Sequence, residues 1–200
     1  MKKILIIVGL LALTAAACNQ QPTSQTPTPP PTPVSTTPTT QTYTNGTYGF
    51  KFDYPTSMLF VTPTYANLED KIVQVQIPQS TYPKTNFGDA ALSVSSQFAK
   101  DLASCLKLSP PEGSDGFKTK ATINGVNFYM TNSNGAGAGN FYEGKVYRTI
   151  KAAGGACIEV AETIHTGNID NYPTGTVVEV DHTDVQAKLD TVLNSFKFTN

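Results

Sequence analysis

Residues 119–131 read TKATINGVNFYMT, and this stretch gives the clearest indication of how the chain folds. Asn124-Gly125 at its centre is a strong signal for a two-residue β-turn, because such a turn needs positive φ angles that Asn and Gly tolerate. Folding the chain there places Ile123 opposite Val126 and brings all the large apolar side chains onto one side. The stretch therefore predicts an antiparallel hairpin with one buried face.

A second hairpin is predicted in residues 141–165, where FYEGKVYRTI and ACIEVAETIH flank a pair of glycines. We expect a three-residue loop at 153–155, because this register pairs Ile150 with Ile158. A two-residue turn at the glycines would instead place Ile150 opposite Glu159 and mix the two faces.

Further elements follow from apolar periodicity. Alternation predicts strands in YGFKFDYP (48–55) and around Val75, and a short helix is expected over 97–107. Thr183 and Gln186 have the spacing of a capping box, and an apolar stripe follows them. Strands outnumber helices, so we expect an α+β fold: an antiparallel sheet with flanking helices.

The opening YGFKFDYP and the closing LDTVLNSFKF (189–198) resemble the ends of PsbP-like domains, which are named for a lumenal subunit of photosystem II. The resemblance covers residues 43–200 and implies an α/β/α sandwich. The tryptophan that the family commonly carries soon after the first proline is absent, since the chain has no Trp. No ligand-binding motif of the family is recognisable, so the resemblance assigns no functional residue.

The first 18 residues have the pattern of an export signal. Two lysines precede an apolar run that is too short to cross a bilayer, which takes about 20 residues. LTAAAC (13–18) resembles the lipobox of bacterial lipoproteins, with Ala15 where that family prefers Leu. We expect residues 1–17 to be a signal peptide and Cys18 to be lipidated. The alternative is an ordinary secretory signal that leaves Cys18 free.

Residues 18–42 are rich in Pro and Thr and carry no charge, so they are predicted to form a disordered stalk before a domain at 43–200. The expected partners are the membrane, through the lipid, and an envelope protein or polymer. The expected location is the extracytoplasmic face of the cell membrane, or of the outer membrane if the host has one. With 14 Lys plus Arg against 15 Asp plus Glu, the charge balance argues against nucleic acid.

Two cysteines remain beside Cys18, and in an exported protein Cys105 and Cys157 are expected to form a disulfide. Two separate buried thiols are the alternative. Neither cysteine has Cys or His neighbours at ligand spacing, so we expect no metal site there and no cofactor.

Arg148 is the only arginine, and in the expected register it lies diagonal to Glu162 on the face that carries Tyr142. These three residues form either a small ligand pocket or, more simply, a buried ion pair. The same register places His165 opposite Glu143, a pair with the chemistry of a general base. No nucleophile motif accompanies it, so no catalytic residue is assigned.

Three polar segments have a structural and a functional interpretation. Asp181, His182 and Asp184 suit either the start of a helix or a small cation site. The glycine-rich run 134–140 suits a mobile connector better than a phosphate loop, because it falls between two strands. Residues 168–173 suit a solvated turn better than weak calcium binding.

Taken together, these features predict a lipid-anchored extracytoplasmic protein with a non-enzymatic binding or scaffold domain. The alternatives are a cell-envelope hydrolase and a carrier or sensor of a small ligand or cation.

Overall fold

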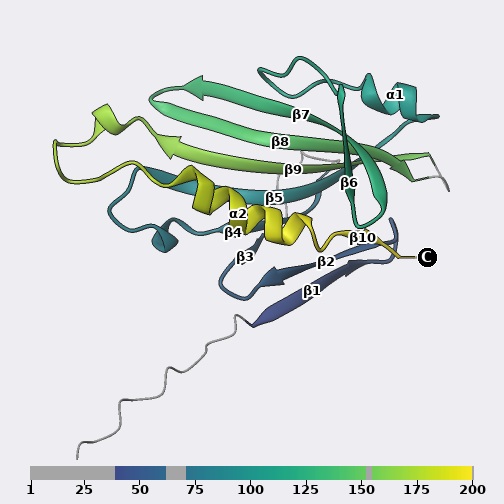
Figure 1. Cartoon of the computed structure of the whole chain (residues 1–200), viewed down its shortest axis with the longest axis horizontal. Helices are drawn as coiled ribbons and strands as arrows, with labels where there is room; N and C mark the ends of the chain where they lie inside the picture. The colour runs from purple at the N-terminus through teal and green to yellow at the C-terminus, as the bar shows by residue number, and fades with distance from the viewer. Residues whose placement is uncertain (1–38, 62–70, 152–154, 200) are drawn as a thin grey trace, which may run out of the picture. The chain divides into compact units, whose positions relative to one another are not determined.

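The computed structural model describes residues 39–61, 71–151 and 155–199 (Figure 1). The predicted signal peptide, Cys18 and most of the predicted stalk lie outside these residues. The first strand begins at Thr40, inside the segment that was predicted to be stalk. No helix in the described part of the chain is long and apolar enough to span a membrane.

The described residues contain ten strands, two α-helices and two 3-10 turns. The strands are β1 (Thr40–Asn45), β2 (Phe50–Pro55), β3 (Leu59–Val61), β4 (Lys71–Ile77), β5 (Phe87–Phe98), β6 (Thr119–Ile123), β7 (Val126–Gly137), β8 (Asn140–Lys151), β9 (Ala156–Gly167) and β10 (Lys197–Phe198). The helices are α1 (Leu102–Leu106) and α2 (His182–Leu193), and the 3-10 turns are η1 (Gln79–Thr81) and η2 (Ile169–Asn171).

Seven strands form an antiparallel sheet in the order β3-β4-β5-β9-β8-β7-β6, and three more form a small sheet in the order β1-β2-β10. Helix α2 packs against β5, β9 and β2, whereas α1 packs against β8 (Figure 1). The fold is α+β and richer in sheet than the α/β/α sandwich that we expected, because α1 is only five residues long.

The main core lies between the large sheet and α2. Alternate residues of a strand point to opposite faces, so Ile158 and Val160 contribute to this core while Cys157 faces the other way. Strand β2 closes the core, as the alternation in YGFKFDYP predicted, and the rings of Phe50 and Phe196 stack with centroids 5.4 Å apart.

The first predicted hairpin is confirmed. Strands β6 and β7 pair with Ile123 opposite Val126, and the turn residues Asn124 and Gly125 have φ angles of 47° and 78°. These angles are the ones that a two-residue turn demands, which explains why the Asn-Gly pair fixes the register.

The predicted register of the second hairpin is wrong by one residue. Lys151 pairs with Ala156, so Arg148 lies opposite Glu159 rather than Val160. The reason is that Tyr147, and not Arg148, points into the main core beside Val160. A shift of one residue moves every side chain of one strand to the other face, so Arg148 leaves the face that carries Glu162.

Two other predictions are corrected. The helix expected over 97–107 shrinks to α1, because β5 continues to Phe98, which pairs with Ala156 and is 81% exposed. The carboxylate of Asp101 starts the short helix by accepting a hydrogen bond from the backbone N–H of Ser104 at 2.7 Å. The glycine-rich run is strand for most of its length, since only Ala138-Gly139 form the turn between β7 and β8.

Candidate functional site

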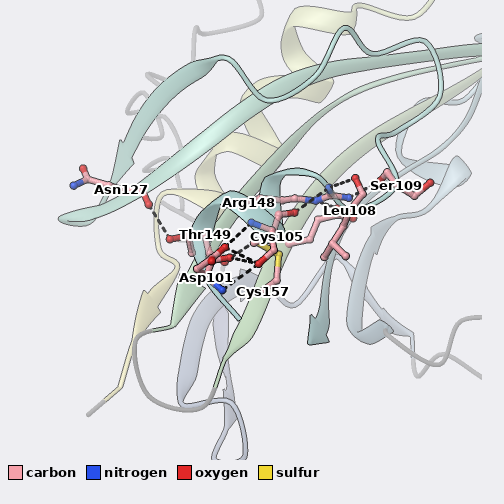
Figure 2. The surroundings of a disulfide bond; sticks show 10 residues. Asp101, Cys105, Leu108, Ser109, Asn127, Arg148, Thr149 and Cys157 are labelled. Atoms are coloured by element: carbon pink, nitrogen blue, oxygen red, sulfur yellow. Dashed lines mark hydrogen bonds and ion pairs between the residues drawn. A yellow bond between two sulfur atoms is a disulfide. The ribbon is translucent and has the colours of Figure 1, made fainter. Parts of the chain in front are cut away.

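Arg148 anchors the segment that follows α1 (Figure 2). Its side chain is 4% exposed, and its Nε donates a hydrogen bond to the Glu159 carboxylate at 2.7 Å. Its terminal nitrogens donate to the backbone carbonyls of Leu108 at 3.0 Å and Ser109 at 2.8 Å. The guanidinium lies 4.3 Å from the centre of the Phe117 ring. A buried charge that is paired and hydrogen-bonded on all sides is a structural anchor.

The predicted disulfide is confirmed beside this anchor (Figure 2). Cys105 of α1 and Cys157 of β9 are bonded with their Cα atoms 5.4 Å apart, and both are buried. Arg148 also donates to the carbonyl of Cys105 at 3.5 Å. The bond and the arginine therefore hold α1 and the following loop to one face of the sheet, which we call the clamp face: the face that carries Arg148 and Cys157.

The structure does not bring Arg148, Glu162 and Tyr142 together. Glu162 lies on the opposite face of the sheet, which we call the groove face. Tyr142 shares the clamp face but lies six residues from Arg148 along β8, where its ring stacks on His165 at a centroid distance of 4.6 Å. The cause is the register of β8 and β9, which pairs Arg148 with Glu159.

The expected pair of His165 and Glu143 is wrong for the same reason. The ring of His165 instead contacts the Asp89 carboxylate at 3.3 Å and the Asn140 side-chain oxygen at 2.8 Å. Glu143 lies on the groove face, where its carboxylate is hydrogen-bonded to Nδ1 of His182, the first residue of α2. Sequence reasoning missed this pair, because the two residues lie 39 positions apart and no local pattern links them.

A polar groove surrounds the pair of Glu143 and His182. It consists of three hollows of about 670, 390 and 350 Å³ that all include Glu143 in their walls. Strands β7, β8 and β9 and helix α2 provide most of its lining, with contributions from the loops before η2 and α2. Its polar and aromatic walls include Glu112, Asn134, Phe141, Tyr142, Glu143, Lys145, Thr166, Asn168, Glu179, His182, Gln186 and Asp190.

The start of α2 places His182 and Gln186 in the groove. Asp181 caps the helix, because its carboxylate accepts hydrogen bonds from the backbone N–H groups of Thr183 at 2.9 Å and Asp184 at 3.3 Å. The predicted capping box of Thr183 and Gln186 is therefore wrong, and the Gln186 side chain is free to reach across to the sheet.

The helix start that these residues suited is thus observed, and the alternative of a small cation site at the same place does not assemble. The Asp184 carboxylate is occupied by the hydroxyl of Tyr82 at 2.6 Å and by Lys188. Within residues 39–61, 71–151 and 155–199, no group of three or more His, Cys, Asp or Glu side chains is arranged to hold a metal ion.

Glu162 lies beneath the groove and is fully buried. Its Oε2 accepts a hydrogen bond from Gln186 at 2.9 Å, while its Oε1 has no partner among the side chains and backbone groups that the structure describes. Burial, reinforced by the nearby charge of Asp190, raises the pKa of Glu162 to about 7. Burial, together with the charge of Glu162, also raises the pKa of Tyr147.

Lys145 is the one lysine in the walls of these three hollows, and its ammonium lies 3.5 Å from the Asp190 carboxylate. Glu112 and Glu179 make no ion pair within the described part of the chain. The mouth of the groove carries the half-exposed ring of Phe141. The groove is thus rich in acceptor oxygens and has an aromatic rim.

The loop at 168–173 is a hydrogen-bonded turn at the edge of the groove. The side chain of Asn168 accepts from the backbone N–H of Asp170 at 3.0 Å, and Asn171 donates to the carbonyl of Gly139 at 3.1 Å. These contacts use the polar groups of the loop to hold it against the turn between β7 and β8.

No family model and no curated protein matches the chain. Solved structures of similar shape include PsbP (CyanoP) from Synechocystis sp. PCC 6803, with a TM-score of 0.47, 15% identity and coverage of 82% of this chain and 95% of that one. LpqN of Mycobacterium tuberculosis, described as involved in cell envelope biogenesis, gives a TM-score of 0.48, 11% identity and coverage of 81% and 91%.

A protein from Bacteroides thetaiotaomicron VPI-5482 gives a TM-score of 0.46 and 12% identity, with coverage of 80% of this chain. The chain spans about half the length of that protein, 48%. All three TM-scores lie below 0.5, so these similarities assign no role to any residue of this chain.

Proposed function

We propose that this chain is a lipid-anchored extracytoplasmic protein whose domain binds another component of the cell envelope, a protein or a polymer, in the polar groove. The proposed role is binding or scaffolding without catalysis. The observation that carries the proposal is the groove itself: three adjoining hollows with polar walls, and the exposed ring of Phe141 at the rim, on one face of the sheet.

Export is supported by two independent features. The leader ends in LTAAAC, the lipobox-like stretch before the proposed lipid site at Cys18. The buried disulfide between Cys105 and Cys157 belongs to an oxidising compartment, because thiols in the bacterial cytosol are kept reduced. The proposed stalk of residues 18–42 would hold the domain away from the membrane. The segments that resemble PsbP-like sequences, 48–55 and 189–198, lie near the two ends of the proposed domain.

Binding is favoured over catalysis by how the groove side chains are occupied. A serine, threonine or cysteine nucleophile is activated by a hydrogen bond to a base. Ser133 and Thr183 lie in the walls, but no hydrogen bond joins either hydroxyl to His182 within the described residues. Several polar side chains of the groove are instead paired with one another, as Glu143 is with His182 and Lys145 with Asp190.

The pair of Glu143 and His182 is the observation that favours a second candidate, an envelope hydrolase. A carboxylate that orients a histidine can support general-base chemistry. Turnover of purified cell-wall polymer by the mature protein, lost on His182→Ala, would favour this candidate over the first.

Site-specific photocrosslinking in the protein's own cells tests the main proposal. A photoreactive residue at Phe141, on the rim of the groove, is expected to trap an envelope component. The matched control is Phe98, which is 81% exposed at the far end of β5 and outside the groove. Adducts from Phe98 and none from Phe141 would contradict the proposal.

The anchor is tested separately by the intact mass of the mature protein. We expect a chain that begins at Cys18 and carries acyl groups. Mature material that retains Met1 would overturn the lipid-anchored part of the proposal.

A further inference from the structure

The polar groove carries more acidic than basic side chains. Glu112, Glu143 and Glu179 line its largest hollow, whose walls include neither lysine nor arginine. In the adjoining hollows Lys145 is engaged with Asp190. The charge of the walls therefore favours a ligand that brings positive charge with it.

An acidic lining alone does not define a ligand, but the buried carboxyl below it adds an independent observation. Glu162 is fully buried, and it faces Gln186 and Asp190, two side chains that line the groove. One of its oxygens has no hydrogen-bond partner in the described structure. Buried polar atoms are nearly always paired, so an unpaired acceptor directly beneath a groove marks a place for a donor.

Gln186 donates a hydrogen bond to the buried carboxylate of Glu162, and this donor is shared. Its amide nitrogen donates both to Glu162 at 2.9 Å and to Asp190 at 3.0 Å. A rotation of this side chain would open the buried carboxyl to the hollows that Gln186 lines.

The exposed ring at the rim can contact the apolar part of a positively charged ligand. The ring of Phe141 is 48% exposed at the largest hollow. Aromatic faces attract cations and also pack against the methylene groups of an alkyl chain.

We propose that the polar groove binds an organic cation with alkylammonium groups, and that its innermost ammonium displaces Gln186 and donates to the free oxygen of Glu162. An ammonium has three donors and no acceptor, which matches walls that offer carboxylate oxygens. The inference rests on the proposed function and names the ligand chemistry. A free polyamine and a lysine side chain of a partner protein both supply it.

Binding changes the protonation state of Glu162. Glu162 enters the complex as a carboxylate, so the proton that it holds in the free protein passes to the solvent as the ammonium arrives. The charged and titratable groups that face Glu162 are Lys145 and Tyr147 from β8 and Asp190 from α2. From β5 the opposing residue is the apolar Leu92. Binding should therefore release a proton below neutral pH.

Titration calorimetry on the full mature chain in detergent, with its disulfide intact, tests the proposal. The probes are spermidine and a short lysine-containing peptide with blocked ends, and the control is fully acetylated spermidine. We expect saturable binding of at least one cationic probe and none of the control. Repeating the titration at pH 6 in two buffers of different ionisation enthalpy reports the released proton.

Variants locate the binding. Glu143→Gln, at an exposed wall position, is expected to weaken binding by about tenfold or more, as for loss of a charge-assisted contact. Glu162→Gln is expected to abolish the proton release. Asp115→Asn removes a carboxylate from an exposed loop outside the groove and should leave binding unchanged.

The outcomes separate the two proposals. If neither cationic probe binds while Phe141 still crosslinks to an envelope component, the cation inference fails and the proposed function stands. If the probes bind equally to the parent, Glu143→Gln and Glu162→Gln, the groove is not their site and the inference also fails. Binding of the peptide without spermidine, or the reverse, identifies the source of the ammonium.

Discussion

The two faces of the large sheet treat buried charge in opposite ways. On the clamp face, Arg148 is surrounded by the Glu159 carboxylate, backbone carbonyls and the Phe117 ring. On the groove face, Glu162 is also buried, but among the described residues its Oε2 accepts from Gln186 while its Oε1 has no hydrogen-bond partner. Both residues come from neighbouring strands of one hairpin.

This difference separates structural from functional roles. A buried charge that already makes four hydrogen bonds, as Arg148 does, stabilises its surroundings and has little capacity left for a ligand. A buried carboxyl with an unused acceptor destabilises the folded state, and such groups are concentrated at binding and catalytic sites. The clamp face therefore fixes α1 and the loop after it, and the groove face carries the main core and the proposed recognition surface.

The largest expected effect comes from the disulfide of the clamp face. Replacing both Cys105 and Cys157 with Ala should lower the free energy of unfolding by about 4 kcal/mol, because the bond closes a loop of 52 residues in the unfolded chain. Chemical denaturation under non-reducing conditions measures the difference. A double variant as stable as the parent would mean that Arg148 alone holds α1.

Arg148→Met should lower the free energy of unfolding by about 3 kcal/mol, because it leaves Glu159 and several buried carbonyls without their donor. Arg148→Lys is the matched control, which keeps the charge but not the planar fork, and its loss should be smaller. Binding in the groove should survive both changes at temperatures where the variants remain folded. Selective loss of binding would contradict the division between the two faces.

The groove face predicts a pH dependence of stability. The pKa of Glu162 is raised from 4.5 to about 7 in the folded chain, so the folded state holds the proton more tightly than the unfolded state. Its contribution is fully present below pH 4.5 and is lost as the pH rises toward 7, by at most about 3 kcal/mol. Glu162→Gln should remove this slope and be more stable than the parent at pH 8.

The measurement is the difference in unfolding free energy between the parent and Glu162→Gln from pH 4 to pH 8, so that other titrating groups cancel. A difference that does not change across this range would show that the Glu162 carboxyl is not held in its neutral form.

The smallest expected effect concerns the residues that cap the two helices, Asp181 at the start of α2 and Asp101 at the start of α1. Asp181→Ala should cost about 1 kcal/mol, because two backbone N–H groups of α2 lose their acceptor. Asp101→Ala removes the cap of α1, where the disulfide still holds the helix, so its effect should be smaller. Thermal unfolding of the two variants side by side measures this, and a larger effect of Asp101→Ala would contradict the expectation.

Local sequence signals predicted the elements whose geometry is local. Asn124-Gly125 determined one hairpin to the residue, because the φ angles of the turn allow few other residues. The alternation around Phe50 and Phe52 and the stripe of α2 identified faces of the core. The disulfide followed from the two cysteines that remain beside Cys18.

The parts that were missed depend on long-range packing. The second hairpin lacks a turn signal as strong as Asn-Gly. The pairing of Ile150 with Ile158 gave a plausible buried face, but the strands pair one residue away from that register. That single shift placed Arg148 and Glu162 on one face and paired His165 with Glu143. The contact between Glu143 and His182 also depends on where α2 lies on the sheet, which no pattern in the sequence specifies.

The fold keeps the Glu162 carboxyl buried beneath the groove, with one oxygen unpaired in the described part of the chain. NMR titration of side-chain carboxyl carbons, with Glu162→Gln used to assign the signal, tests it directly. We predict a Glu162 signal that titrates near pH 7 and moves to lower pH when spermidine or the lysine peptide is bound. A signal that titrates near pH 4.5 in the free protein would contradict the claim.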